Sequence, residues 1–332
     1  VRTGSGETHR IKAFDPEGQR TLSEVPEVWL SPAREAILTP ESAERARELV
    51  RAACDAVDLP SSKARAVVDD VASGRAFFGA EGFLPAYADL ARRAERKDFE
   101  SEAADELASV YISRLEFDRA APLIEQAILL AEQSGSAEAR GRALRFAGQL
   151  HMSRGELDEA QAALEAAREH LAEAGAAWSL GRTLNFAAWV ARRQEDVHRS
   201  ERLFRESIRV LAGLEDRAAL CESQRGLAEL LLENGRVDEA ERLALAARET
   251  VGPHDLTSLA TTSMALGRVR AAQGRDEEAE ELLREALEII SSTLHRSGQR
   301  ETLTALARFY RERGREDEAA ELDERRERLL AD

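Results

Sequence analysis

Six small residues recur at an almost constant spacing along this sequence. The intervals are 40, 40, 40, 39 and 40 residues, and the positions are Ala120, Ala160, Ser200, Ala240, Ala279 and Ala319. A fixed period of this length is typical of one supersecondary unit that is copied and stacked into a solenoid, where each unit packs mainly on its neighbours. The period therefore predicts a repeat architecture, whose extended curved surface favours binding over catalysis.

The residues that precede each small position repeat as well. Residues 154–160, 234–240, 273–279 and 313–319 read RGELDEA, NGRVDEA, QGRDEEA and RGREDEA, while 114–120 (RLEFDRA) and 193–200 (RQEDVHRS) are degenerate copies. Each copy lies between two apolar-periodic stretches of helical length. Glycine suits the left-handed residue that ends a helix, and acidic residues suit the positive first turn of the next one. Each unit is therefore predicted to be a helix A, a tight turn and a helix B.

The side chains that flank the turn resemble those of the tetratricopeptide repeat family, whose pattern is Leu-Gly-x2-Tyr on helix A and Ala-x3-Phe on helix B. The matching groups are Leu107-Ala108 and Tyr111 with Ala120 and Ile124; Ala147-Gly148 and His151 with Ala160 and Leu164; Ser200 with Phe204; Leu266-Gly267 with Ala279 and Leu283; and Leu306-Ala307 and Tyr310 with Ala319. The period of about 40 exceeds the family's 34 residues, which is similar to a long-period bacterial variety. The resemblance implies an all-α, right-handed α-α superhelix of about six to seven helix-turn-helix repeats.

The resemblance covers residues 100–332, which we expect to end in a polar C-terminal capping helix. Residues 40–99 are predicted to hold an N-terminal capping helix and a degenerate repeat. Residues 1–39 lack a helical period and contain Gly, Pro, Ser and Thr, so we expect a flexible N-terminal arm or linker. The alternative is an arm that docks through Val25, Trp29 and Leu30, because a tryptophan in a polar tail favours burial.

Charge and composition exclude several classes of function. The net charge is −16, which disfavours direct nucleic-acid binding. The sequence has no apolar run long enough for a membrane helix and no signal peptide, so we expect a cytoplasmic protein. Cys54 and Cys221 lie too far apart to suggest a disulfide framework or a metal site, and reduced core cysteines are expected.

Sequence motifs for nucleotide binding, metalloprotease chemistry or a nucleophile elbow are absent from the 332 residues. We therefore expect no enzyme activity, no catalytic residue, no cofactor and no metal. The six histidines are scattered, and His151 stands at the position of the helix A tyrosine, which predicts a core residue.

The resemblance implies that helix A lines the concave surface of the superhelix. Positions 18, 15, 11 and 8 residues before each small residue differ by 3, 4 and 3, so they lie on one helical stripe. The candidate partner-binding residues on this stripe are Arg142, Arg145, Gln149, Arg182, Asn185, Trp189, Arg192, Arg225, Arg268 and Arg308. The same stripe carries acidic residues, among them Glu102, Asp105, Glu222, Glu229 and Glu301.

The arginines of this stripe allow three interpretations. They resemble the carboxylate clamp with which some tetratricopeptide domains hold a peptide C-terminus, with Arg in place of Lys. They also suit a groove for an acidic ligand of another kind, because guanidinium groups bind carboxylates bidentately. Alternatively, they pair with neighbouring glutamates on a solvated face.

The predicted function is a non-catalytic protein–protein interaction module that binds a peptide or a partner domain in its concave groove. An acidic segment of the partner is favoured by the arginines. Two alternatives stay open: the sensory or regulatory arm of a multidomain bacterial transcription regulator, and a self-assembling structural scaffold that forms a homo-oligomer.

Overall fold

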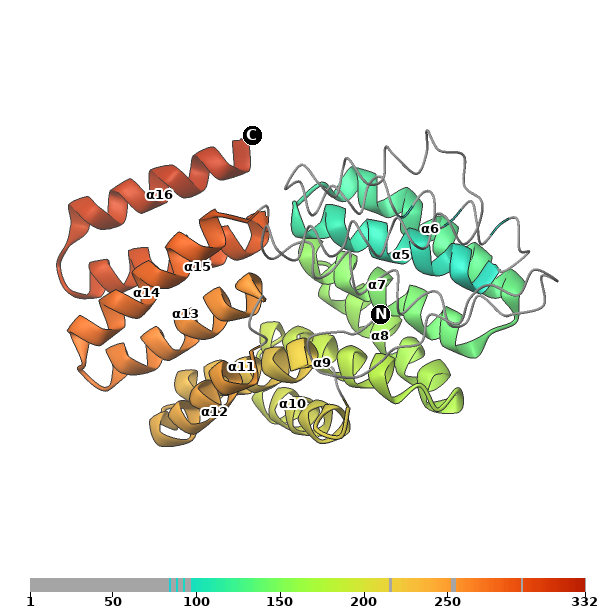
Figure 1. Ribbon diagram of the computed structural model, residues 1–332, viewed down its shortest axis with the longest axis horizontal. Coiled ribbons are helices and arrows are strands. Elements are labelled where there is room, and N and C mark those ends of the chain that lie inside the picture. Colours follow the sequence, from blue (N-terminus) through green and yellow to red (C-terminus); the bar gives the residue numbers. More distant parts are fainter. Residues whose placement is uncertain are drawn as a thin grey trace, which may run out of the picture.

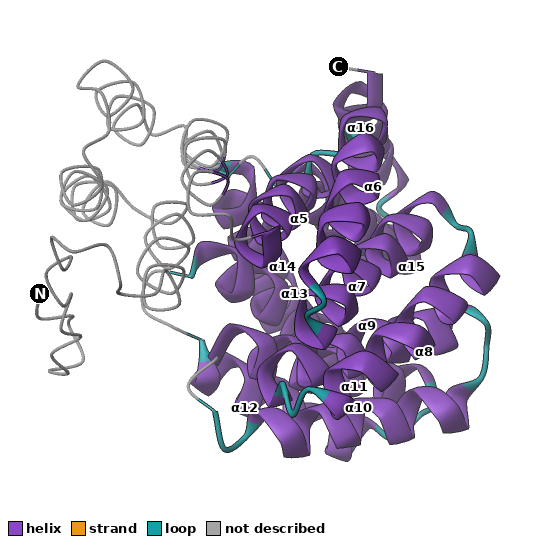
Figure 2. Cartoon of the chain, turned by 90° about the vertical axis from the view of Figure 1, so that its right-hand side faces the viewer, coloured by secondary structure: helices purple, strands orange, loops and turns teal. Residues whose placement is uncertain are grey.

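A computed structural model describes residues 97–214, 217–251, 255–293 and 295–331, together with Leu84, Ala88 and Arg92. In these residues every regular element is an α-helix, and the helices form six consecutive pairs (Figures 1 and 2). They are α5 (Lys97–Ser113), α6 (Phe117–Ser134), α7 (Ala137–Arg154), α8 (Leu157–Glu173), α9 (Ala177–Arg193), α10 (Val197–Leu211), α11 (Arg217–Glu233), α12 (Val237–Thr250), α13 (Leu256–Ala272), α14 (Asp276–Ser291), α15 (Arg296–Glu312) and α16 (Glu316–Ala331). The predicted all-α solenoid is confirmed.

The helices are arranged in two rows. The odd-numbered helices are the predicted helices A, and each of them contacts the next odd-numbered helix as well as its own partner. Helix α15 also contacts α5, so the inner row curves back toward its beginning, as Figure 1 shows. This curvature gives the chain a concave interior that is lined by the odd-numbered helices, with the even-numbered helices outside.

The six small residues are the points where helices of a pair meet. Each is the fourth residue of an even-numbered helix, and all six are completely buried. A Cβ atom on Gly148 would lie 2.5 Å from Cγ of Leu164, and one on Gly267 would lie 2.9 Å from Cγ of Leu283. Small residues on one helix therefore make room for large ones on its partner, as the sequence pattern predicts.

The turn within each pair keeps one backbone conformation even where its glycine is missing. Gly155 has a φ of 88°, and in the two degenerate copies Leu115 and Glu195 have φ values of 66° and 63°. The amide of Asp196 donates to the carbonyl of Ala191 at 2.9 Å, which is the hydrogen bond that closes this kind of helix end. Two ordinary residues thus carry a left-handed conformation that favours glycine.

Two single-residue predictions have different outcomes. His151 was expected in the core, but its ring is half-exposed and Nδ1 lies 2.6 Å from Oε2 of Glu156 in the following turn. The imidazole is polar, and the carboxylate beside it offers a partner at the helix end. Cys221 is a buried free thiol, and burial raises its pKa to about 12, as expected for a reduced core cysteine.

The predicted arm 1–39, nearly all of the predicted segment 40–99, and Cys54 lie outside the described residues. At the other end, α16 exposes most of its charged side chains, and Asp323 lies 2.6 Å from Arg311 and 2.9 Å from Arg326. None of the helices described is long and apolar enough to cross a membrane.

Candidate functional site

The predicted stripe forms one continuous ionic cluster on the concave side. We call it the inner network; it consists of Arg192, Glu222, Arg225, Glu229, Glu233, Arg268 and Glu301. Its centre is Glu229 of α11, which is only 2 % exposed. Arg225, Arg268 and Arg192 approach its carboxylate at 2.5, 2.7 and 3.3 Å, and they come from α11, α13 and α9. Three inner helices therefore meet at one buried carboxylate.

The outer part of the inner network consists of three further carboxylates. Glu233 lies 2.5 Å from Arg192 and 3.1 Å from Arg268. Glu222 lies 2.5 Å from Arg225, and Glu301 of α15 reaches the same guanidinium at 3.4 Å. The arginines of the network are thus shared between carboxylates of different repeats.

The arginines of the inner network are more deeply buried than its outer glutamates, so the exposed charge of this surface is negative and not positive as the arginine stripe suggested. The Arg225 side chain is 6 % exposed, and those of Arg268 and Arg192 are also largely covered. By contrast, the side chains of Glu222, Glu233 and Glu301 are 38, 40 and 44 % exposed. The concave surface in this region therefore presents carboxylates, with the guanidinium groups beneath them.

The protonation of Glu229 follows from its neighbours. Burial alone would raise the pKa of this carboxyl, but Arg225, Arg268 and Arg192 outweigh that effect and hold the pKa at about 2. The carboxylates of Glu222, Glu229 and Glu301 keep the pKa of Arg225 well above its ordinary value, although burial opposes this. Both groups are consequently ionised at neutral pH.

Trp189 packs inside the network. The guanidinium groups of Arg192 and Arg225 lie 4.7 and 4.9 Å from the indole, within the range of cation–π contacts. The indole also meets the ring of Phe204 edge-on at 5.4 Å, and a Cβ atom on Gly226 would lie 3.0 Å from Cζ2. Trp189 therefore connects α9, α10 and α11.

A second charged cluster lies between α5 and α7. Arg142 lies 3.5 Å from Asp105 and 3.7 Å from Glu102, and it donates to the carbonyl of Asp98 at 3.0 Å. Asp105 is completely buried, and its carboxylate oxygens accept no hydrogen bond from any described residue. Burial raises the pKa of Asp105 to about 8 in spite of the nearby Arg142 and Arg145. The guanidinium of Arg145, itself buried, lies 3.9 Å from the ring of Phe146.

The other candidate residues lie apart from these clusters. Asn185 donates to Oγ of Ser223 at 2.9 Å, in a buried contact between α9 and α11. The guanidinium of Arg182 lies 5.1 Å from the ring of Trp178, and Gln149 is half-buried. Arg308 of α15 is 53 % exposed and lies 3.7 Å from Glu312. Partial burial, together with the nearby Arg268, lowers the pKa of Arg308, although Glu312, Glu233 and Glu229 oppose this effect.

The geometry selects between the interpretations of the arginine stripe. Arg142, Arg192 and Arg268 pair with carboxylates of other inner helices, and Arg225 pairs with Glu222 and Glu229 of its own helix. Pairing with glutamates was one of the alternatives, but these guanidinium groups are largely covered and do not form the solvated face that it described. The sequence had placed Glu222, Glu229 and Glu301 on the same stripe, so the signal for pairing was present. The sequence analysis missed Glu233, which directly follows the stripe residue Leu232. It also could not show which of the charged side chains are more deeply buried.

Comparison with known families identifies the repeat. A family model described as tetratricopeptide repeat matches residues 258–332, and a second one with the same description matches residues 103–138. Both matched segments of the chain are tetratricopeptide repeats. The matched segments comprise α13–α16 and α5–α6, and the spacing of the intervening helix pairs is the same.

Solved structures share the fold. A Rap protein complexed with Competence and Sporulation Factor superposes with a TM-score of 0.60 at 12% identity, covering 91% of this chain and 96% of that chain. Aspartyl phosphate phosphatase F from Bacillus subtilis superposes with a TM-score of 0.58 at 13% identity, covering 81% of this chain and 72% of that chain. BtubC (BKLC) from P. vanneervenii superposes with a TM-score of 0.51 at 20% identity, covering 69% of this chain and 91% of that chain. At these identities the likeness shows the fold alone.

A curated relative matches only a segment. Over 77 residues the chain is 46% identical to the transcription-repair-coupling factor of Myxococcus xanthus. The segment represents 23% of this chain and 6% of that protein, so the chain spans a small part of its relative's length.

Family and structure agree on a broad class of function. Tetratricopeptide repeats are protein-interaction modules, typically without catalytic activity, and they present extended concave surfaces. Among the described residues no group of three or more His, Cys, Asp and Glu side chains is arranged to hold a metal ion.

Proposed function

We propose that this protein binds a peptide segment or a partner domain in its concave groove. The observation that supports this most directly is the arrangement of the inner network. Side chains from four inner helices meet on one interior surface, and their exposed ends are those of Glu222, Glu233 and Glu301. A curved surface that joins several repeats suits an extended partner better than a small molecule.

The charges in the groove indicate the chemistry of this partner. The exposed carboxylates favour basic side chains on the bound segment, and the net charge of −16 would steer such a segment toward the protein. The buried arginines are already paired, so an acidic segment would have to separate existing ion pairs. Arg308 is the exception, because it is exposed, and we place an acidic group of the partner there.

Site-directed photo-crosslinking in the source cells tests this proposal. Thr304 lies on the stripe of α15 and is exposed, and within the described segments its hydroxyl donates to the Arg300 carbonyl of its own helix. A photo-crosslinking amino acid in its place should capture a partner polypeptide. The same amino acid in place of Arg209, exposed on the outer helix α10, is the matched control. Crosslinks that form equally at both positions would contradict binding in the groove.

A charge reversal then tests the chemistry of the partner. Glu301→Lys should reduce crosslinking at Thr304, because it introduces a positive charge beside the bound basic segment. Arg308→Glu should have a smaller effect, since it removes one peripheral contact. If only Arg308→Glu abolishes the crosslink, the partner presents an acidic segment, as the sequence had suggested.

The regulatory-arm alternative has one supporting observation, the segment shared with a much longer protein named for the coupling of transcription and repair. On this second proposal the groove belongs to one arm of a larger chain. The coding sequence beside this segment should then encode a nucleotide-binding core and a helix-turn-helix domain. A bacterial source, a cytoplasmic location and self-assembly stay predictions from the sequence.

A further inference from the structure

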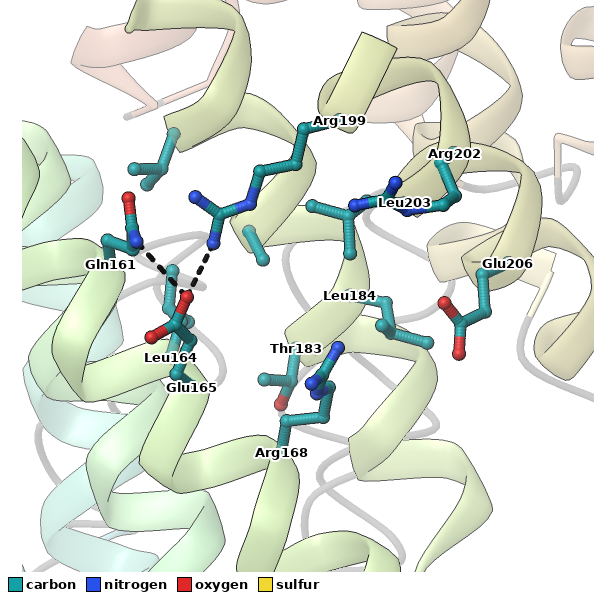
Figure 3. A pocket seen from close by; sticks show the side chains of 12 residues that line it. Gln161, Leu164, Glu165, Arg168, Thr183, Leu184, Arg199, Arg202, Leu203 and Glu206 are labelled. Carbon is teal, nitrogen blue, oxygen red and sulfur yellow. Dashed lines mark hydrogen bonds and ion pairs between the residues drawn. The ribbon is translucent and has the colours of Figure 1, made fainter. Parts of the chain in front are cut away.

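A cleft of about 220 Å³ lies on the outer side of the superhelix, between α8 and α10 (Figure 3). Its floor is formed by α9, with Leu184, Ala187 and Val190. Leu164 of α8 and Leu203 of α10 extend this apolar surface on the two sides. The cleft is formed because two outer helices flank an inner one without filling the space above it. It shares no residue with the inner network.

The rim of the cleft carries an excess of positive charge. Arg199 lies 2.6 Å from Glu165, a pair seen in Figure 3 together with the hydrogen bond from Gln161 to the same carboxylate. Arg168 and Arg202 are exposed, and neither forms an ion pair or hydrogen bond with any residue of the described segments. Three arginines thus face Glu165 and Glu206, in a chain whose net charge is −16.

The next boundary between outer helices shows a different arrangement. Between α10 and α12, Arg236 contacts Glu201 of the preceding repeat at 2.9 Å and its own neighbour Glu239 at 2.7 Å. The arginine at this boundary is therefore paired with carboxylates of its own and of the preceding repeat. Arg168 and Arg202 are available to an external anion, and they stand beside an apolar floor.

We propose that this outer cleft is a second docking site, which takes one apolar side chain from an acidic segment of a partner protein. Arg168 and Arg202 bind carboxylates of the segment, because a guanidinium presents two parallel donors to a carboxylate. The volume is below the roughly 300–1,000 Å³ of typical small-molecule pockets, which fits a single side chain better than a metabolite. Acidic groups on both sides of that side chain complement the rim.

Selection from a random library of short peptides displayed on phage tests the site with a defined probe. The wild-type protein should enrich peptides that carry Asp or Glu beside a Leu, Ile, Met or Phe. Binding of these peptides should fall by about tenfold or more in Arg168→Glu/Arg202→Glu, since two attractive contacts with the acidic segment become repulsive. Arg209→Glu/Arg242→Glu is the matched control, because both residues are exposed, lie outside the cleft and change the charge equally.

A second variant separates shape from charge. Ala187→Leu places a larger side chain on the half-buried floor without changing the charge, and it should weaken the same peptides. Circular dichroism of each variant verifies that the helices are intact. The proposal is wrong if the library yields no acidic-apolar motif, or if the selected peptides bind the arginine variant as tightly as wild type. Peptides lost only in Glu301→Lys would support the concave groove and contradict the outer cleft.

Discussion

Arg225 of α11 and Glu301 of α15 lie 3.4 Å apart, although 76 residues separate them and α13 lies between their helices in the inner row. In most solenoids each repeat contacts only its immediate neighbours. Here the curvature of the inner row brings two non-adjacent repeats to the same ionic cluster. The inner network therefore links repeats that would otherwise behave independently.

The central carboxylate should contribute most to this link. Glu229→Gln removes the charge that Arg192, Arg225 and Arg268 share, and leaves three guanidinium groups close together with less compensation. We expect the free energy of unfolding in urea to fall by about 3 kcal/mol or more, as for other broken buried ion pairs. Glu312→Gln is the control; its carboxylate is exposed, and its loss should cost less than about 1 kcal/mol. Equal effects of the two substitutions would show that the network is energetically a surface feature.

The same carboxylate makes stability depend on acid. The pKa of Glu229 is about 2 in the folded protein, against an ordinary value of 4.5. A depressed folded pKa contributes stability that is present above pH 4.5 and is lost as the pH falls toward 2. Melting temperatures measured at pH 7, 5, 4 and 3 should therefore fall less steeply below pH 5 for Glu229→Gln than for wild type. Parallel curves would contradict the assigned role.

Asp105 should give the opposite pH dependence. Burial raises its pKa from 3.8 to about 8, so its contribution is fully present below pH 3.8 and is lost as the pH rises toward 8. Asp105→Asn keeps the shape and cannot ionise. The variant should match wild type near pH 4 and become progressively more stable than wild type up to pH 8, by at most about 1.4 kcal/mol per pH unit. Denaturant titrations at pH 4, 6 and 8 measure the difference. A variant that is destabilised at pH 8 would show that Asp105 is ionised beside Arg142.

The sequence predicted the helix pairs and their contacts well, because these depend on local pattern. The burial of Ala160 and the close approach of Gly148 to Leu164 follow from spacing and size. The helical stripe likewise identified most members of the inner network. Helical spacing, however, gives the face of a helix and not the depth of a side chain, so it could not place Arg225 beneath Glu301. Depth depends on the curvature that brings α15 back toward α5.

The degenerate turn at Glu195 provides a test of how far backbone conformation is dictated by the repeat. This residue is exposed, has a φ of 63°, and occupies the place of the glycine in the regular copies. A left-handed conformation costs a residue with a Cβ atom about 1–2 kcal/mol, while glycine loses about 0.4–1 kcal/mol through the entropy of its unfolded chain. Glu195→Gly should therefore stabilise the protein by about 0.5–1 kcal/mol. Glu195→Ala removes the same side chain but keeps the Cβ atom, and it should not stabilise. Chemical denaturation of the three proteins under one condition decides the matter, and an alanine variant as stable as the glycine variant would assign the gain to the lost carboxylate.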